Sequence, residues 1–286
     1  MDLSIITVSW RVRDLARDNF SAIYKNTENI EFEVIAIDND SRDGTVEMIA
    51  KEFPRVKLIA NNYNAGFAKA NNQGIGISQG RYVLLLNPDM RVLPGMLERM
   101  VKWMDERRDV GLAGCHLIKE NGETVAQVRR YPGFSDQLAI VLKLPHIFPA
   151  ILNSYLRKDF DYKKEGEVDS IRGSFFIIRR EVIDKLGGLD ERYFLWFEEV
   201  DYCRQVKNAG WKVIYTPEVQ CIDLVGKSFG LLKRGKSQDY FRDSMIKYFE
   251  KWQPAWQALI LKIVWPIGIA LAVAGEKLKF KANAKT

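Results

Sequence analysis

The chain has 286 residues, 47% hydrophobic and 28% charged, so it can bury a full core as one large domain or as one domain with an appendage. Its net charge of +6 and pI near 9.0 suit an anionic partner, but no nucleic-acid-binding motif accompanies the charge, which favours a diphosphate or an acidic membrane. The two histidines, which lack metal-ligand spacing, exclude a histidine-rich zinc site.

The first half of the sequence alternates predicted strands and helices. Apolar runs predict strands at 3–10, 32–37, 56–60 and 82–86, and helices are expected at 14–24, about 41–51 and about 68–74. Alternation of this kind predicts βαβ units and a mostly parallel sheet in the α/β class.

Two of these strands end at carboxylates. The run Tyr82–Leu86 is stopped by Pro88, which cannot donate to a sheet ladder, and Asp89 follows. The second strand ends at Asp38. Because open α/β sheets bind ligands at the carboxyl ends of their strands, we expect both acids on one rim, together with the Asn/Gly-rich loop 61–66.

A nucleotide site at this rim would need a metal ion. No G-x-G-x-x-G follows Trp10, and the sequence has no G-x-x-x-x-G-K-[ST] phosphate loop. Mg²⁺ and Mn²⁺ prefer carboxylate and phosphate oxygens and use only one or two protein carboxylates. We therefore interpret Asp89 as the residue that holds a divalent cation and the diphosphate of a sugar nucleotide.

The middle of the chain is less regular. A helix is predicted from Pro94 to Arg108, followed by a hairpin of 110–115 and 124–129. The segment 131–166 has no clear pattern and is assigned loosely to acceptor recognition. Sheet character returns at 171–178, where Gly173 allows a close backbone approach.

A second group of acids stands at the start of a predicted helix that Glu198 opens. Glu199 and Asp201 lie in its first turn, where the helix dipole stabilises carboxylates, so an acidic cap would explain them. The aromatic residues before them, including Trp196 and Phe197, favour catalysis instead. Such an apolar wall raises a carboxyl pKa toward the range of a general base and can stack on a sugar.

Six motifs stand in a fixed order over roughly the first 230 residues. They are TVSW at 7–10, IDNDSRDG at 37–44, NYNAGFAKANNQG at 62–74, LLNPD at 85–89, GGLDERYFLWFEEVDYCRQ at 187–205 and GKSF at 226–229. In this order they resemble the inverting family 2 glycosyltransferases, particularly bacterial rhamnosyltransferase-like members. The resemblance implies a GT-A fold, in which a Rossmann-like sheet binds a nucleotide sugar and a smaller part binds the acceptor.

The resemblance also implies roles for individual residues. Asp38 pairs with the nucleotide base, Asn39 lies near the ribose, and Asn87-Pro88-Asp89 is a divergent D-x-D metal motif. The expected donor-binding residues are Thr7, Ser9, Asp38, Asn39, Asn64, Gly66, Asn71, Asn87 and Asp89. The expected acceptor-binding residues are Gly173, Trp196, Phe197 and Glu198.

Inverting transfer is a single displacement, which needs a base for the acceptor hydroxyl and a cation for the leaving diphosphate. The second acid of the family's Glu-Asp pair is the base, which corresponds here to Glu199, with Asp201 as the second candidate. Asp223 replaces the family's usual histidine and joins Asp89 as an expected ligand of Mg²⁺ or Mn²⁺. The residues expected to compensate its charge are Lys227, Lys233, Arg234 and Lys236.

The C-terminal part has a different composition. A helix is predicted at 238–252, and 256–275 is almost entirely apolar, but Lys262, Pro266 and Gly268 interrupt it. Either a core or oligomer helix or an interfacial membrane segment would fit, and the flanking tryptophans and lysines favour the membrane segment.

We therefore expect a GT-A domain at 1–235, with a nucleotide-sugar part (1–115) and an acceptor part (116–235), followed by a helical membrane-associated segment at 236–286. The expected reaction moves rhamnose or another hexose from dTDP-L-rhamnose or a UDP-hexose to a polyprenyl-diphosphate-linked saccharide in bacterial surface-polysaccharide synthesis.

Three cysteines in apolar or helical stretches, and a first strand without a preceding signal peptide, predict a peripheral or monotopic protein on the cytoplasmic face of the inner membrane. No nucleic-acid partner is expected. Two alternatives stay open. One is a non-catalytic nucleotide-sugar-binding or scaffolding subunit, for which Asp223 and Arg11 are departures from the family pattern. The other is a sugar nucleotidyltransferase, which the lack of a basic glycine-rich signature after Trp10 disfavours.

Overall fold

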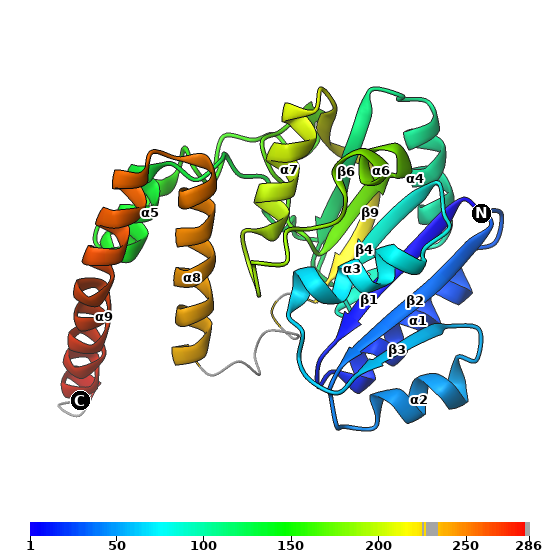
Figure 1. Cartoon of the computed structure of the whole chain (residues 1–286), viewed down its shortest axis with the longest axis horizontal. Coiled ribbons are helices and arrows are strands. Elements are labelled where there is room, and N and C mark those ends of the chain that lie inside the picture. Colours follow the sequence, from blue (N-terminus) through cyan, green and yellow to red (C-terminus); the bar gives the residue numbers. More distant parts are fainter. Residues whose placement is uncertain (225, 227–233, 284–286) are drawn as a thin grey trace.

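The computed structural model describes residues 1–224, 226 and 234–283, and its centre is one mixed sheet (Figure 1). The strand order is β3-β2-β1-β4-β8-β6-β9-β5, and β7 pairs with β9. The strands are β1 (Leu3–Ser9), β2 (Phe32–Asn39), β3 (Lys57–Asn61), β4 (Tyr82–Leu86), β5 (Met90–Val92), β6 (Val110–Ile118), β7 (Gly166–Glu167), β8 (Phe175–Arg179) and β9 (Lys212–Asp223).

Strands β1 to β4 run parallel, as the βαβ pattern predicts, and β8 is antiparallel to both β4 and β6. Helices cover both faces. The helices are α1 (Arg13–Asn26), α2 (Thr45–Glu52), α3 (Phe67–Ile77), α4 (Met96–Asp105), α5 (Phe134–Val141), α6 (Arg180–Leu186), α7 (Glu198–Asn208), α8 (Arg234–Trp252) and α9 (Ala255–Asn283).

Side-chain alternation along the strands creates two cores. In β1, Ile5 belongs to a core shared with α1, α2 and α4, whereas Ile6 belongs to a core shared with α3, α6 and α7. The continuous apolar runs read from the sequence are thus strands covered on both faces, and the polar residues follow at the strand ends.

Three predicted elements differ from the structure. Strand β2 continues through Asn39, so Asp38 lies inside the strand. The hairpin at 110–129 is reduced to one bridge between Ile118 and Thr124; β6 pairs instead with β9 along its length and with β8 at Leu112 and Ala113. The segment 131–166 holds α5, the 3-10 helices η1 (Leu144–His146) and η2 (Pro149–Leu152), and the start of β7.

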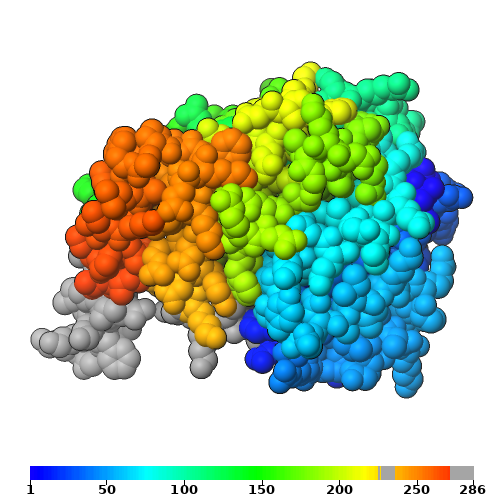
Figure 2. Space-filling model, in the orientation of Figure 1, coloured from blue at the N-terminus to red at the C-terminus, as the bar shows by residue number. Residues whose placement is uncertain are grey.

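The C-terminal helices pack on the body of the protein. A separate core joins α8 and α9 to Val141 of α5 and to Phe197 and Val200 at the start of α7. Figure 2 shows these helices in orange against the yellow-green segment that precedes α7. Helix α9 is continuous through Pro266, and Gly268 lets it approach the Val141 carbonyl closely. Over the residues described here, no helix combines the length and apolar character needed to cross a bilayer.

Candidate active site

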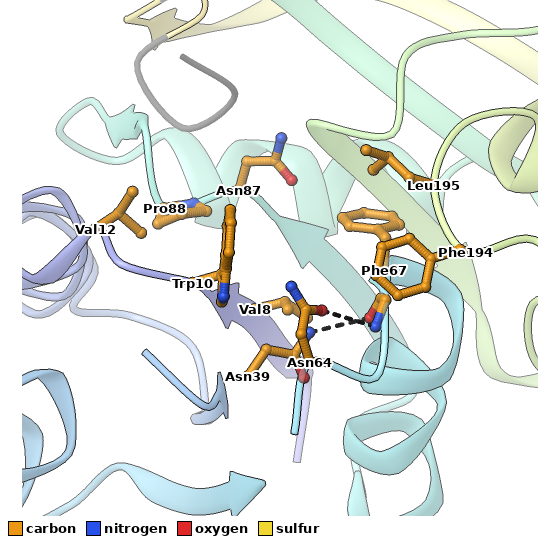
Figure 3. A pocket seen from close by; sticks show the side chains of 11 residues that line it. Val8, Trp10, Val12, Asn39, Asn64, Phe67, Asn87, Pro88, Phe194 and Leu195 are labelled. Atoms are coloured by element: carbon orange, nitrogen blue, oxygen red, sulfur yellow. Dashed lines mark hydrogen bonds between the residues drawn. The ribbon is translucent and has the colours of Figure 1, made fainter. Parts of the chain in front are cut away.

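A cavity opens where the carboxyl ends of β1, β2 and β4 meet, at the rim that the sequence predicts. Figure 3 shows Trp10 facing Phe67 and Phe194, with Asn39 and Asn64 at one end and Asn87 at the other. The lining residues are Val8, Trp10, Val12, Asn39, Asn64, Gly66, Phe67, Asn87, Pro88, Phe194 and Leu195.

Five of the predicted donor-binding residues are buried and do not line the cavity: Thr7, Ser9, Asp38, Asn71 and Asp89. Thr7 and Ser9 occupy the opposite strand phase from Val8, and the Thr7 hydroxyl donates to Asn19 Oδ1 of α1 at 3.4 Å. The Asn71 amide donates to the Phe67 carbonyl one helical turn back, at 2.9 Å. Val8 of β1 and Trp10, which follows the end of that strand, line the cavity instead.

The asparagine loop before α3 is built around Gly66. Asn39 Nδ2 donates to the Gly66 carbonyl at 3.1 Å, and the Gly66 N–H donates to Asn64 Oδ1 at 2.9 Å (Figure 3). Gly66 has φ +81°, and a Cβ atom there would lie 2.6 Å from the Phe194 carbonyl oxygen. This position requires glycine, and it brings the nucleotide-side loop against the segment that leads into α7.

Asp38 combines burial with an open acceptor. Its side chain is 2% exposed, and Oδ2 accepts the Ser41 N–H at 3.0 Å. Within the described chain, Asp38 Oδ1 has no hydrogen-bond partner. A buried carboxylate oxygen without a donor is costly, so this atom is suited to a ligand N–H or O–H.

Asp89 and Asp223 lie together at the start of β5 and the end of β9. Met90 pairs with Asp223, and the Leu224 N–H donates to the Asp89 carbonyl at 3.0 Å. Burial raises the pKa of the Asp223 carboxyl, Arg172 lowers it, and the nearby Asp89 carboxylate raises it.

No group of three or more His, Cys, Asp or Glu side chains suited to a metal occurs in the part of the chain that the structure describes. Two hard oxygen ligands still fit Mg²⁺ or Mn²⁺, which commonly take the rest of their coordination from substrate phosphates and water.

Arg172 is a site residue that the sequence-based interpretation missed. Its Nη1 lies 3.1 Å from Asp223 Oδ2, so it supplies the positive charge that was expected from the downstream basic residues. Lys227 and Lys233 fall outside the described residues, and Lys236 is exposed. The sequence feature that could have indicated this role is the position of Arg172 directly before Gly173, which was already expected at the site.

Glu199 is connected to the cavity by a chain of close contacts. The Asn87 N–H donates to the Ser174 carbonyl at 3.0 Å, next to Gly173. A Cβ atom on Gly173 would lie 3.4 Å from Glu199 Cβ and 3.6 Å from Phe67 Cε1. Glu199 and Phe67, which belongs to the aromatic wall of the cavity, therefore both flank Gly173.

The two glutamates have altered acidities. Burial raises the pKa of the Glu199 carboxyl, while Arg129 and Arg172 lower it. Burial, and then the Glu199 charge, raise the pKa of Glu198 well above its usual range. A buried oxygen of each carboxyl has no partner within the described chain. Glu199 thus has the burial and the free acceptor oxygen that a general base needs.

Asp201, the second candidate base, is fully buried and is surrounded by hydrogen-bond donors. Its Oδ2 accepts Lys251 Nζ at 2.8 Å and Gln205 Nε2 at 2.6 Å, and its Oδ1 accepts the Trp252 indole N–H. The carboxylate is saturated with donors, so it is not placed to take a proton from an acceptor.

The aromatic residues expected to bind the acceptor also face helices. Trp196 makes an edge contact with Phe241 at 6.2 Å between ring centroids, and Phe197 contacts the same ring at 5.5 Å. Phe197 is 5% exposed, because α8 covers it. Gly173 flanks Phe67 of the cavity wall, and none of the four residues expected to bind an acceptor lines the cavity itself.

The chain is similar to known proteins in sequence and in fold. The model of the family described as glycosyl transferase family 2 matches residues 4–187. The N-acetylglucosaminyl-diphospho-decaprenol L-rhamnosyltransferase of Mycobacterium tuberculosis (strain H37Rv) is 26% identical over 208 residues, covering 69% of this chain and 68% of that protein.

Rhamnosyltransferase WbbL of Escherichia coli K12 is 23% identical over 207 residues, covering 69% of this chain and 74% of that protein. Among solved structures, the mannosyltransferase PcManGT from Pyrobaculum calidifontis, in complex with GDP-Man and Mn²⁺, has a TM-score of 0.59 at 20% identity. That match covers 96% of this chain and 75% of the other.

Proposed function

Because the chain belongs to glycosyltransferase family 2, we propose that it moves L-rhamnose or another hexose from a dTDP- or UDP-linked donor to a prenyl-diphosphate-linked saccharide. The proposal depends most on one observation: a Cβ atom placed on Gly173 would lie 3.4 Å from Glu199 Cβ and 3.6 Å from Cε1 of Phe67, which lines the cavity. Glu199 and the cavity wall thus flank the same glycine, which supports a base at this position. The names of the M. tuberculosis and E. coli relatives support the donor and acceptor classes.

We propose that the donor's base lies at Asp38. The open Oδ1 atom of this carboxylate can accept the imide N–H that uracil and thymine share. Amide groups of Asn39, Asn64 and Asn87 line the adjacent cavity and can bind the ribose and the sugar. Trp10 offers a flat apolar surface to the base.

The leaving diphosphate is proposed to lie toward Asp89, Asp223 and Arg172. The two carboxylates would hold Mg²⁺ or Mn²⁺, which supplies positive charge to the departing phosphates. Arg172 brings a permanent second positive charge at 3.1 Å from Asp223. This arrangement explains how a family member can carry aspartate where histidine is usual.

Glu199 is proposed to take the proton of the acceptor hydroxyl as that oxygen attacks the anomeric carbon. One displacement then forms the new glycosidic bond, breaks the bond to the diphosphate and inverts the anomeric centre. A carboxyl whose pKa is raised by burial is a stronger proton acceptor in its ionised form than an exposed one. Positioned proton transfer of this kind contributes roughly 10²- to 10⁴-fold in rate.

We further propose that the C-terminal segment rests on the membrane that holds the acceptor. One face of α9 exposes large apolar side chains at helical spacing, Trp256, Leu259, Ile263 and Ile267, with exposed fractions from 52% to 63%. The neighbouring η1–η2 region exposes Ile147 at 69% and Phe148 at 60%. Such a concentration of exposed apolar residues suits a lipid surface.

The test is a transfer assay with dTDP-L-rhamnose, MnCl₂ and N-acetylglucosaminyl-diphospho-prenol. We expect dTDP release coupled to a disaccharide product of inverted anomeric configuration. Glu199→Gln should fold and bind donor but lose transfer by about 10²-fold or more, while Glu181→Gln on an exposed position of α6 keeps it. Equal turnover in wild type and Glu199→Gln would remove Glu199 from the mechanism. Absence of transfer from dTDP-L-rhamnose and from each UDP-hexose tested would contradict the enzyme proposal.

A further inference from the structure

The turn that delivers the two glutamates has an unusual backbone. Trp196 and Phe197 are consecutive residues at φ +65° and +69°, in the left-handed region that bulky side chains rarely adopt. Glu198 begins α7 immediately afterwards. Conformations of this kind persist only where surrounding contacts determine them, so something must hold this turn.

Helix α8 makes the contacts that hold it. The Ser244 hydroxyl donates to the Leu195 carbonyl at 2.8 Å, and Ser244 is only 1% exposed. Phe241 and Tyr248 of the same helix pack on Phe197, at 5.5 and 5.6 Å between ring centroids. One face of α8 therefore covers the turn with both a hydrogen bond and aromatic rings.

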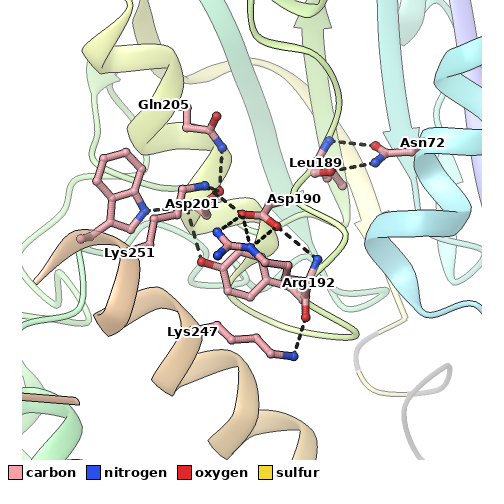
Figure 4. Close-up of polar contacts among 10 residues, drawn as sticks. Asn72, Leu189, Asp190, Arg192, Asp201, Gln205, Lys247 and Lys251 are labelled. Atoms are coloured by element: carbon pink, nitrogen blue, oxygen red, sulfur yellow. Dashed lines mark hydrogen bonds and ion pairs between the residues drawn. The ribbon is translucent and has the colours of Figure 1, made fainter. Parts of the chain in front are cut away.

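The same helix also fastens the chain before and after the turn (Figure 4). Before the turn, Lys247 Nζ donates to the Arg192 carbonyl at 2.6 Å, and Lys251 Nζ lies 3.0 Å from Asp190 Oδ2. After the turn, Lys251 Nζ lies 2.8 Å from Asp201 Oδ2. A single lysine thus joins the two ends of the segment that contains the strained residues.

The Asp201–Lys251 ion pair has the features of a fixed support. Asp201 has no exposed surface and Lys251 is largely covered, so the pair is shielded from water. Asp201 Oδ1 accepts the Trp252 indole N–H as well. Removing one partner of a shielded pair leaves an uncompensated charge, which makes its geometry hard to change.

We propose that α8 holds the 190–201 segment in the conformation that aims Glu199 at the acceptor, which makes Ser244, Lys251 and Asp201 positioning residues for the transfer. This inference rests on the proposed role of Glu199. Asp201 then acts on the reaction through the placement of α7, without touching substrate. The C-terminal segment becomes part of the catalytic apparatus in addition to its proposed contact with the membrane.

Ser244→Ala is the most direct test, because it removes one hydroxyl and adds no bulk. We expect kcat for transfer from dTDP-L-rhamnose to fall by about ten- to hundredfold, with an unchanged KM for the donor. Calorimetry should still find one donor site per chain. That stoichiometry would show that the lower kcat does not come from a smaller fraction of folded protein. Ser244→Thr, which keeps the hydroxyl, should recover part of the rate.

Ser78→Ala is the matched control, since Ser78 Oγ donates to the Ile75 carbonyl at 2.7 Å, away from the α8 contacts. It should leave kcat unchanged. Fluorine NMR of protein labelled with 5-fluorotryptophan gives a second readout that needs no turnover. The Trp196 resonance should shift or split in Ser244→Ala and stay in place in Ser78→Ala.

The outcomes separate the two proposals. Wild-type kcat together with an unmoved Trp196 resonance in Ser244→Ala would overturn the positioning role of α8. Loss of transfer in Glu199→Gln alongside that result would leave the proposed function intact. A wild-type protein without transfer would contradict the proposed function, while the fluorine spectra would still decide whether α8 holds the turn.

Discussion

Replacing Gly66 by alanine should push the loop that contains it away from Phe194, in the segment that leads into α7. Gly66 has φ +81° and ψ 179°, a region that is essentially restricted to glycine and costs about 1–3 kcal/mol for other residues. The added Cβ would also lie 2.6 Å from the Phe194 oxygen and 2.8 Å from its ring. Ordinary contact begins near 3.4 Å, so the Phe194 backbone must retreat by about 0.8 Å.

Because Phe194 lines the cavity proposed to bind the donor, that retreat should weaken binding of dTDP-L-rhamnose as well as stability. We expect the donor Kd, measured by calorimetry, to rise about tenfold or more, which corresponds to roughly 1.4 kcal/mol. The free energy of unfolding, measured with denaturant, should fall by at least the backbone cost.

Gly187 offers a matched control. It has φ 80° and ψ −165°, almost the same backbone conformation, but no atom lies within 4 Å of a Cβ added there. Gly187→Ala should therefore lose a similar backbone contribution, about 1–3 kcal/mol, and keep the wild-type donor Kd. Equal donor affinity in the two variants would refute the contact between Gly66 and Phe194 as a determinant of the cavity.

Three further predictions concern charge, metal and membrane. Burial raises the pKa of Glu198 above its ordinary value of 4.5, so the folded protein favours the protonated carboxyl. The resulting contribution to the free energy of unfolding is fully present below pH 4.5 and is lost as the pH rises through the raised pKa. Denaturant unfolding should show this loss in wild type and not in Glu198→Gln. Asp89→Ala should abolish the strengthening of donor binding by Mn²⁺ in calorimetry. The control Asp159→Ala, which alters an exposed side chain, should keep that effect. An effect of Mn²⁺ that survives in Asp89→Ala would exclude Asp89 as a metal ligand. Ile263→Glu should reduce cosedimentation of the protein with anionic lipid vesicles. The control Ile77→Glu, which alters an exposed isoleucine on α3, should not. Equal cosedimentation of the two variants would contradict the proposed membrane face.

Sequence reasoning locates the rim because the signals there are local. An apolar run of five residues followed by Pro88 ends β4 where expected, and Asp89 follows at once. Parallel pairing of β1 with β2 and β4 then brings the strand ends together. Strand periodicity and proline chemistry act within a few residues, so they can be read without knowledge of the rest of the chain.

The same reasoning does not find contacts between distant parts of the sequence. Lys251 reaches Asp201 across 50 residues, and nothing near either residue indicates the pair. Two aromatic residues at positive φ give no turn signal, because glycine or asparagine normally marks that conformation. Tertiary packing imposes it, so Asp201 looks like a catalytic acid in the sequence and a structural one in the fold.

The exchange of histidine for Asp223 can be understood through Arg172 in the same way. A second carboxylate beside Asp89 would by itself repel a diphosphate, and a metal ion held by both would have part of its charge cancelled. The Arg172 guanidinium at 3.1 Å returns one positive charge to that position. Arg172 also lowers the pKa of Glu199, so one side chain acts on both Asp223 and the proposed base. The departure at Asp223 is therefore paired with a cation that links the proposed metal ligand to the proposed base.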